Sequence, residues 1–279
     1  MSKIGIIAGS GQFPFLFAKA AREQGRQVCI AAHKGESSPD LETVADSICW
    51  VKLGQLGKII KFFRDEGVQE AVLLGAITKT RIFKDIWPDL KGLSLWNRIK
   101  IRQDDQILRA VAESLQEEGI AILESTLYLQ HLLFPKGILT KKKPTAEHLA
   151  DIRFGWQMAR EVGRLDIGQC VVVRDRTVLA VEAIEGTDAT IRRGGALGRE
   201  QAVVVKVKKP GQDFRFDLPA IGIRTIESMV EVKAGVLAVE AGQALLFDGE
   251  SVIEQADRAG IVVVGIEEKS PGELDLGRH

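Results

Sequence analysis

Residues 3–33 of the chain read KIGIIAGSGQFPFLFAKAAREQGRQVCIAAH. The apolar run over residues 4–8 predicts a buried strand, and a glycine-bearing turn follows it directly. Apolar positions at helical spacing over residues 15–24 predict a helix that ends at Gly25, and residues 27–32 form a second strand-like run. Two strands joined through a helix are typical of a parallel sheet, so this stretch indicates an α/β fold.

The alternation of strands and helices continues through the first half of the chain. Further strands are expected over residues 48–53, 71–74 and 120–123, and further helices over residues 56–66 and 104–118. Such an alternation predicts a parallel sheet covered on both faces. We therefore expect a Rossmann-like N-terminal domain over residues 1–134, in which residues 81–102 form a helical or loop excursion over a site.

A polar stretch with two prolines, one glycine and four lysines over residues 135–145 predicts a linker. The pattern beyond it is again α/β, but a turn at Asp175 and Arg176 between two apolar runs predicts a hairpin and hence a mixed sheet. We expect a second α/β domain over residues 146–279. Its predicted helices cover residues 146–162, 225–232 and 251–259, and its predicted strands cover residues 169–173, 178–183, 202–207, 236–240, 244–247 and 261–266. The polar tail after Glu267 is expected to fray.

The amino-acid composition argues against several classes of protein function, as its charge, cysteines and apolar runs indicate. The 279 residues have a formal net charge of zero, which lacks the basic excess typical of nucleic-acid binding. The three cysteines have no metal-ligand spacing, which favours a reducing compartment. No signal peptide precedes the first strand, and no apolar run approaches the about 18 residues of a membrane span. We expect a cytoplasmic protein, and contact with a membrane surface stays open.

The turn after the first strand is the first candidate binding element. Glycines there let the backbone approach a phosphate at the start of a helix. Pro14 stands where a dinucleotide fingerprint has its third glycine, and the second strand leads to His33 rather than to an acidic ribose ligand, so NAD is disfavoured. A plain strand-to-helix turn is the alternative. The candidate residues are Gly9, Ser10, Gly11, Gln12 and Phe13.

Thr78 and Lys79 follow another predicted strand and form the second candidate. Ligands of open parallel sheets sit at the carboxyl ends of the strands, and these residues offer a hydroxyl and a cation there. A solvated loop explains them equally well.

A charged segment after the strand at residues 178–183 is the third candidate. Carboxylates can hold Mg²⁺, and arginine pairs bidentately with phosphate. A solvated turn is the alternative reading of these charges. The candidate residues are Glu185, Thr187, Asp188 and Arg192.

The fourth candidate runs from Lys206 to Asp217 and mixes lysines and carboxylates with two phenylalanines. In an extended segment, Asp213, Arg215 and Asp217 project to one side. An ion-pair ladder explains this trio, whereas in a phosphate enzyme the same side chains bind metal and position water.

Taken together, these segments resemble the LpxI family, the UDP-2,3-diacylglucosamine pyrophosphatases of Gram-negative lipid A synthesis. The resemblance covers residues 4–266 in the order of the family, and the more specific stretches are EGTDATIRR and QDFRFDLPAIG. The matching segments are IAGSGQFP, LLGAITK, DDQILRAVA, VLAVEAIEGTDATIRR, VKKPGQDFRFDLPAIG and GIVVVGI.

The resemblance implies hydrolysis of UDP-2,3-diacylglucosamine to UMP and 2,3-diacylglucosamine 1-phosphate (lipid X), with Mg²⁺ or Mn²⁺ as cofactor. It also implies a homodimer, and two domains with the ligand held between them. Asp217 matches the position of the family's essential aspartate. The expected metal ligands are Asp217, Asp188 and Glu185, and the expected catalytic carboxylates are Asp217, Asp213 and Asp188.

This assignment agrees with the chemistry of the residues. Cleaving a pyrophosphate requires neutralised phosphates and a positioned water. Lys206, Arg192 and a metal meet the first need, and Asp217 or Asp213 meets the second. The alternatives are a UDP-sugar-dependent transferase and a non-catalytic nucleotide-sugar binding module. A lipid-bearing substrate also suggests peripheral contact with the inner membrane.

Overall fold

The computed structural model describes residues 2–78, 87–98, 104–215, 218–270 and 272–277. The chain forms two compact units. Unit 1 comprises Met1–Gln130 and Asp213–Asp217, and unit 2 comprises His131–Gln212 and Leu218–His279. A short segment from the second half of the sequence therefore belongs to unit 1.

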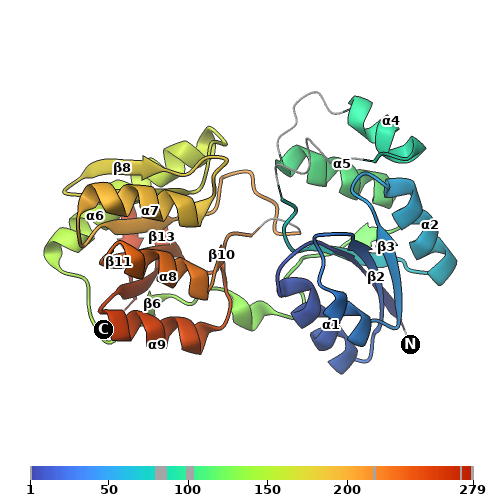
Figure 1. Cartoon of the computed structure of the whole chain (residues 1–279), viewed down its shortest axis with the longest axis horizontal. Coiled ribbons are helices and arrows are strands. Elements are labelled where there is room, and N and C mark those ends of the chain that lie inside the picture. Colours follow the sequence, from blue (N-terminus) through green and yellow to red (C-terminus); the bar gives the residue numbers. More distant parts are fainter. Residues whose placement is uncertain (1, 79–86, 99–103, 216–217, 271, 278–279) are drawn as a thin grey trace. The chain divides into compact units, whose positions relative to one another are not determined.

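Unit 1 is built on a five-stranded sheet in the order β3-β2-β1-β4-β5, in which all pairings are parallel (Figure 1). The strands are β1 (Lys3–Ala8), β2 (Gln27–His33), β3 (Ser47–Val51), β4 (Glu70–Leu74) and β5 (Ala121–Ile122). The helices are α1 (Phe13–Glu23), α2 (Leu56–Glu66), α4 (Leu90–Arg98) and α5 (Asp104–Glu117). This order is that of a Rossmann-like fold and confirms the predicted class.

The cores explain why unit 1 adopts this arrangement. Alternate residues of β1, Ile7 among them, face a cluster that includes Ile59 and Phe63 of α2 and Leu115 of α5. Phe17 on the buried face of α1 is fully buried. Because the buried strands are apolar throughout, the sheet is enclosed by helices rather than exposed to water.

Unit 2 holds a seven-stranded mixed sheet in the order β14-β13-β11-β9-β7-β8, with β6 also paired to β13. Strands β9, β11 and β13 run parallel, whereas β7 is antiparallel to β9 and forms a hairpin with β8. The strands are β6 (Gly137–Ile138), β7 (Cys170–Arg174), β8 (Thr177–Val181), β9 (Val203–Lys206), β11 (Val236–Glu240), β13 (Val262–Ser270) and β14 (Glu273–Asp275). The mixed sheet confirms the prediction for the second α/β domain.

Helices cover both faces of this sheet. Helix α6 (Ala146–Arg164) packs Trp156 and its neighbours on one face. Helices α7 (Thr187–Gly198), α8 (Ile223–Glu231) and α9 (Gly249–Ala259) contribute Ile191, Met229 and Val252 to the cluster on the other face (Figure 1). Two further short strands, β10 (Ala220–Ile221) and β12 (Leu245–Leu246), pair with each other in parallel.

Two expectations for unit 2 were wrong. After a turn at residues 184–185, the charged segment continues into helix α7, which begins at Thr187 and was not among the predicted helices. The polar tail also does not fray at Glu267, because β13 continues to Ser270 and pairs with β14. Among the described residues, no helix has the length and apolar character needed to cross a membrane.

Candidate functional site

The loops that follow β1 and β4 are held together in unit 1. Gly9 N–H donates to Leu74 O at 2.8 Å, and the backbones of Ser10 and Ala76 exchange two hydrogen bonds of 2.8 and 3.2 Å. The Ser10 hydroxyl donates to Ala76 O as well, at 2.8 Å. A Cβ on Gly9 would lie 2.5 Å from Ala76 O, so only glycine allows this approach. Strand order reverses between β1 and β4, and such a switch point is where open α/β sheets bind ligands.

The candidate turn continues into α1. Gly11 has a φ of 88°, which favours glycine, and Gln12 is the N-cap of the helix. Phe13 is buried, and Pro14 lies in the first turn of the helix. The N–H groups of the first turn have no acceptor within the helix, so the missing N–H of Pro14 costs no hydrogen bond. The predicted cradle is therefore a tight turn at the start of a helix, which is a common anion-binding geometry.

The end of β2 adds residues to this edge that the sequence analysis did not select. His33 is buried and its ring lies 2.9 Å from Ala8 O, which can only accept, so Nδ1 carries the proton. The Ser37 hydroxyl donates to the same oxygen at 2.7 Å. Burial lowers the pKa of His33, so its imidazole is neutral at pH 7.

Glu36 connects the loop after β2 to the loop after β4. Its carboxylate accepts the Thr78 N–H at 3.3 Å and the Thr78 hydroxyl at 3.1 Å. Thr78 thus lies beside an acidic side chain, and Lys79 lies outside the described residues. The position of Glu36, shortly after the second strand, is the signal that would have identified it.

The segment that begins at Asp213 is fixed inside unit 1. The Ser125 hydroxyl donates to Phe214 O at 2.9 Å. Arg215 binds the Asp213 carboxylate through Nε at 3.1 Å and through Nη2 at 2.7 Å. This pairing and the charge of Arg109 hold the pKa of Asp213 below its usual range. Residues 214–215 form a turn rather than an extended strand, and Asp217 lies outside the described residues.

A second group of charged residues surrounds buried Cys170 in unit 2. Glu182 N–H donates to Cys170 O at 2.8 Å, and the Thr187 hydroxyl donates to the Glu182 carboxylate at 2.8 Å. Burial, followed by the charge of Glu182, raises the pKa of the Cys170 thiol, and the charge of Lys206 opposes the increase. Cys170 is therefore an inert thiol, and the functional groups here are the charges around it.

Lys206 is buried at the end of β9 and donates to Ala220 O at 2.9 Å. Lys206 lies opposite Cys170 across β9 and β7, and Glu182 donates its N–H to Cys170 O, so both residues lie beside Cys170. The sequence analysis selected Lys206 and Asp188 as site residues.

The other predicted residues of α7 and of the turn before it are engaged in ion pairs. Glu185 binds Arg193 at 2.6 Å, Asp188 lies 3.5 Å from Arg224, and Arg192 pairs with Glu231. Hydrogen bonds from the backbone amide of Glu185 itself and from Arg193 lower the pKa of Glu185. Two of the three expected metal ligands, Glu185 and Asp188, are thus paired with arginines, and the third, Asp217, lies outside the described residues. Within the described ranges, no three His, Cys, Asp or Glu side chains are grouped as a metal site.

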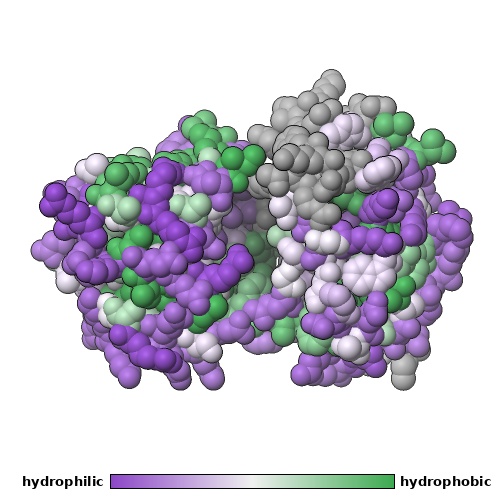
Figure 2. Space-filling model, viewed as in Figure 1, coloured by the Kyte–Doolittle hydropathy of each residue, from purple (hydrophilic) through white to green (hydrophobic). Residues whose placement is uncertain are grey.

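Exposed apolar side chains gather on α4 and just before it in unit 1. Trp87 is 62% exposed, Leu90 88% and Leu93 47%. Figure 2 shows apolar side chains exposed over this helix. The Lys52 ammonium lies 4.3 Å from the centre of the Trp87 ring, so a cation borders this apolar surface.

Comparison with known proteins assigns the chain to a family. Residues 3–132 match the LpxI N-terminal domain, and residues 135–264 match the LpxI C-terminal domain. The chain belongs to the LpxI family. A curated LpxI protein of Caulobacter vibrioides, named UDP-2,3-diacylglucosamine pyrophosphatase LpxI, is 36% identical over 278 residues, which cover 96% of this chain and 98% of that protein.

Two solved structures resemble this LpxI chain distantly. The precorrin-6A reductase CobK aligns with 97% of this chain and 89% of its own, with 12% identity and a TM-score of 0.34. The leucoanthocyanidin reductase of Vitis vinifera in complex with NADPH aligns with 59% of this chain and 44% of its own, with 16% identity and a TM-score of 0.30. Likenesses this slight add nothing to the fold or site described above.

Proposed function

We propose that this LpxI chain hydrolyses the pyrophosphate bond of UDP-2,3-diacylglucosamine, giving UMP and 2,3-diacylglucosamine 1-phosphate in lipid A biosynthesis. The observation that carries the proposal is the 36% identity, over nearly the full length of both chains, to the Caulobacter protein that bears this name. Both halves of the chain match the family, so both units are part of the resemblance.

The residues of the two units suit this chemistry. The turn from Gly9 to Phe13 at the start of α1 is proposed to hold a phosphate, since helix N-termini favour anions. Lys206 and Arg192 are proposed to offset phosphate charge as it develops. Among the predicted carboxylates, Asp213 is held by Arg215, which favours Asp217 as the group that orients the attacking water.

The direct test is to incubate purified protein with UDP-2,3-diacylglucosamine and Mg²⁺ in the absence of any acceptor. We expect equal amounts of UMP and 2,3-diacylglucosamine 1-phosphate. Tight binding without product would instead favour a nucleotide-sugar binding module. Turnover only after an acceptor is added would favour a transferase.

We also propose that turnover requires Mg²⁺ or Mn²⁺, because carboxylate oxygens are ligands that these hard cations prefer. Removing divalent metal with EDTA is expected to lower the rate at least tenfold, an order-of-magnitude expectation for losing an electrostatic contribution to pyrophosphate cleavage. Excess Mg²⁺ should restore the rate. Full activity in metal-free buffer, with the thermal unfolding midpoint unchanged, would contradict this proposal. Because Glu185 and Asp188 form ion pairs with arginines, we assign no step of the hydrolysis to the metal.

The substrate carries two acyl chains, and we propose a cytoplasmic homodimer that touches the inner membrane peripherally. Exposed Trp87, Leu90 and Leu93 support the membrane contact, because tryptophan and leucine beside a cation suit a bilayer interface. Sedimentation with anionic phospholipid vesicles tests the contact, and light scattering tests the dimer. A protein that stays in the supernatant, or a monomer, would contradict the respective part.

A further inference from the structure

His33 stands at the carboxyl end of β2 in unit 1, beside the turn that is proposed to hold a phosphate. Only 8% of the residue is exposed, and its Nδ1 donates to Ala8 O at 2.9 Å. Ala8 directly precedes Gly9 and pairs with Ala32, the residue before His33. The imidazole is therefore fixed against the backbone that leads into the Gly9 turn.

The loop after β2 holds this ring in place without a ligand. The His33 N–H donates to the Ser37 hydroxyl at 3.0 Å, and that hydroxyl donates to Ala8 O at 2.7 Å. The His33 carbonyl accepts the N–H groups of Glu36 and Ser37 at 3.1 and 2.9 Å. These bonds close a tight turn in which Gly35 has a φ of 78°. A side chain that is ordered in advance binds a ligand at a lower entropic cost.

The second ring nitrogen of His33, Nε2, is an acceptor that has no partner in the described part of the chain. Burial lowers the pKa of the imidazole, and because Nδ1 carries the single proton of the neutral ring, Nε2 keeps its lone pair. Nε2 is also not enclosed. Within the described ranges, the fully enclosed side-chain polar atoms without a partner are Arg26 Nε, Ser47 Oγ and Gln169 Oε1. A ligand can therefore reach the open acceptor from outside the protein.

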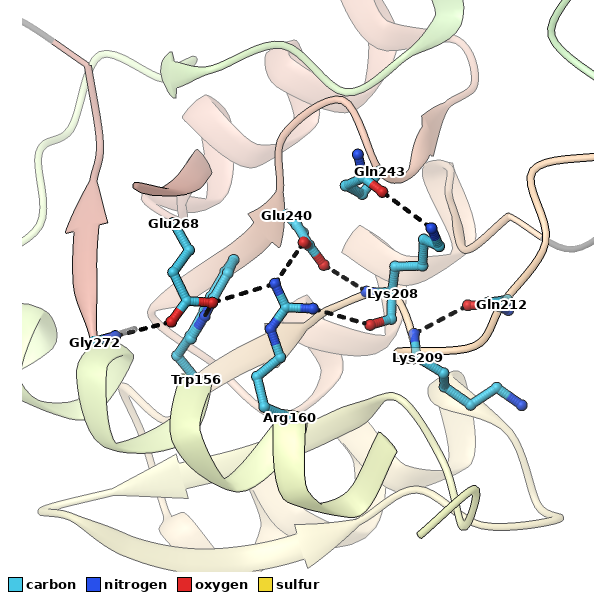
Figure 3. Close-up of polar contacts among 9 residues, drawn as sticks. All are labelled: Trp156, Arg160, Lys208, Lys209, Gln212, Glu240, Gln243, Glu268 and Gly272. Atoms are coloured by element: carbon cyan, nitrogen blue, oxygen red, sulfur yellow. Dashed lines mark hydrogen bonds and ion pairs between the residues drawn. The ribbon is translucent and has the colours of Figure 1, made fainter. Parts of the chain in front are cut away.

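The buried Glu240 of unit 2 shows the opposite situation, in which a polar side chain is matched within the protein. It accepts from Arg160 Nη2 at 2.6 Å and from the Lys208 N–H at 2.8 Å (Figure 3). The same guanidinium donates to Lys208 O at 3.2 Å and lies 3.3 Å from Glu268. Both charges are thus compensated, as buried charges need to be. Nε2 of His33 has no comparable partner among the described residues, which marks it as a position that a ligand completes.

The surroundings of Nε2 select the kind of group that it can bind. The Glu36 charge lies close enough to His33 to raise the pKa of the ring against the effect of burial, and its carboxylate accepts two bonds from Thr78. A neutral acceptor beside a carboxylate disfavours phosphate and requires a group that donates, such as a hydroxyl. The start of α1 has the opposite preference, because helix N-termini favour anions. These two parts of unit 1 therefore suit the ribose and the phosphate of one nucleotide.

We propose that His33 is a specificity-determining residue that accepts, through Nε2, a hydrogen bond from one ribose hydroxyl of the nucleotide. The inference rests on the proposed function, which supplies a uridine nucleotide as the ligand. The end of the second strand is where dinucleotide-binding folds place the acidic side chain that binds the ribose. A carboxylate can accept from two hydroxyls, whereas the neutral imidazole accepts from one. His33 thus takes the place of that acid with a single contact.

Titration calorimetry of the wild-type protein with UDP, 2′-deoxy-UDP and 3′-deoxy-UDP tests the proposal from the side of the ligand. One of the two deoxy analogues should bind about tenfold more weakly than UDP, as expected for the loss of one hydrogen bond. Equal affinity for all three nucleotides would overturn the proposal, and so would a failure of UDP to bind. This comparison does not depend on the folding of any variant.

His33→Asn and His33→Gln separate the two ring nitrogens. Asparagine can place an N–H where Nδ1 stands, so Ala8 O keeps its donor, but nothing replaces Nε2. UDP should bind this variant about tenfold more weakly, and the discrimination against the deoxy analogue should disappear, because both changes remove the same bond. Glutamine can place its side-chain oxygen near the Nε2 position and should restore part of both effects. Undiminished discrimination in His33→Asn would overturn the proposal.

The matched control is His148→Asn in unit 2. His148 is as buried as His33, at 8% exposed, and its Nδ1 accepts the Thr145 N–H at 3.3 Å. This variant should bind UDP and discriminate against the deoxy analogue as the wild type does. A loss of UDP affinity as large as that of His33→Asn would overturn the proposal, since the effect would then be general destabilisation. Absence of UMP release by a wild-type protein that does discriminate would instead reject the proposed hydrolysis and leave the ribose contact standing.

Discussion

Asp217→Asn is expected to abolish most turnover while leaving the protein folded. The amide has nearly the shape of the carboxylate, so packing changes little, but the charge needed to orient or deprotonate water is lost. Losing such a group typically lowers the rate about a hundredfold or more. The measurement is UMP release by the purified variant at saturating substrate, with circular dichroism to verify the fold.

The matched control for this variant is Asp175→Asn. Asp175 is 85% exposed and has a φ of 50°, which asparagine adopts readily. This control should keep wild-type turnover. Asp217→Asn hydrolysing substrate within a few-fold of the wild type would show that Asp217 is not catalytic.

Gly9→Ala is expected to destabilise the protein at the proposed site. Its Cβ would lie 2.5 Å from Ala76 O, and this neighbour is backbone, which cannot rotate away. Forced crowding of this kind typically lowers the free energy of unfolding by about 1–3 kcal/mol. Because the loops after β1 and β4 would separate, KM for the substrate should also rise. Denaturant unfolding and steady-state kinetics measure the two effects.

Gly222→Ala separates crowding from the general effect of replacing a glycine. Its φ is −151°, and a Cβ there would meet nothing within 4 Å. It should lose less stability than Gly9→Ala, because its expected cost is only that alanine is a poorer N-cap of α8 than glycine. Equal midpoints for the two variants would show that the loops tolerate the added atom.

The local sequence pattern predicted the bounds of those helices and strands whose apolar residues are regularly spaced and whose ends are marked by the sequence. Helix α2 has the predicted bounds because Ile59, Ile60 and Phe63 recur at helical spacing and Gly67 ends it with a φ of 72°. Strand β11 also has the predicted bounds, since a short apolar run between polar residues leaves few alternatives.

The sequence did not predict helix α7, because the packing that stabilises it involves residues outside the helix. Gly194, Gly195 and Gly198 lower helix propensity, each by about 1 kcal/mol relative to alanine. In the fold they are needed for close packing: a Cβ on Gly194 would lie 2.6 Å from the Val172 Cβ. These glycines favour the helix only because it packs closely on the sheet, and this contact is seen in the structure rather than in the local sequence.

The sequence indicated which residues belong to the candidate site, but not which of them contact one another. The turn from Gly9 to Phe13 follows from strand and helix signals around it. The contact of Arg160 with Glu240 spans 80 residues and that of Ser125 with Phe214 spans 89, and no local pattern encodes such distances. For the same reason the bond between Glu36 and Thr78 appears only in the structure.

The grouping of residues 213–217 with unit 1 makes that unit discontinuous, because the polypeptide passes between the units three times: after Gln130, after Gln212 and before Leu218. A chain severed between residues 135 and 145 would yield an N-terminal fragment lacking a piece of its own domain.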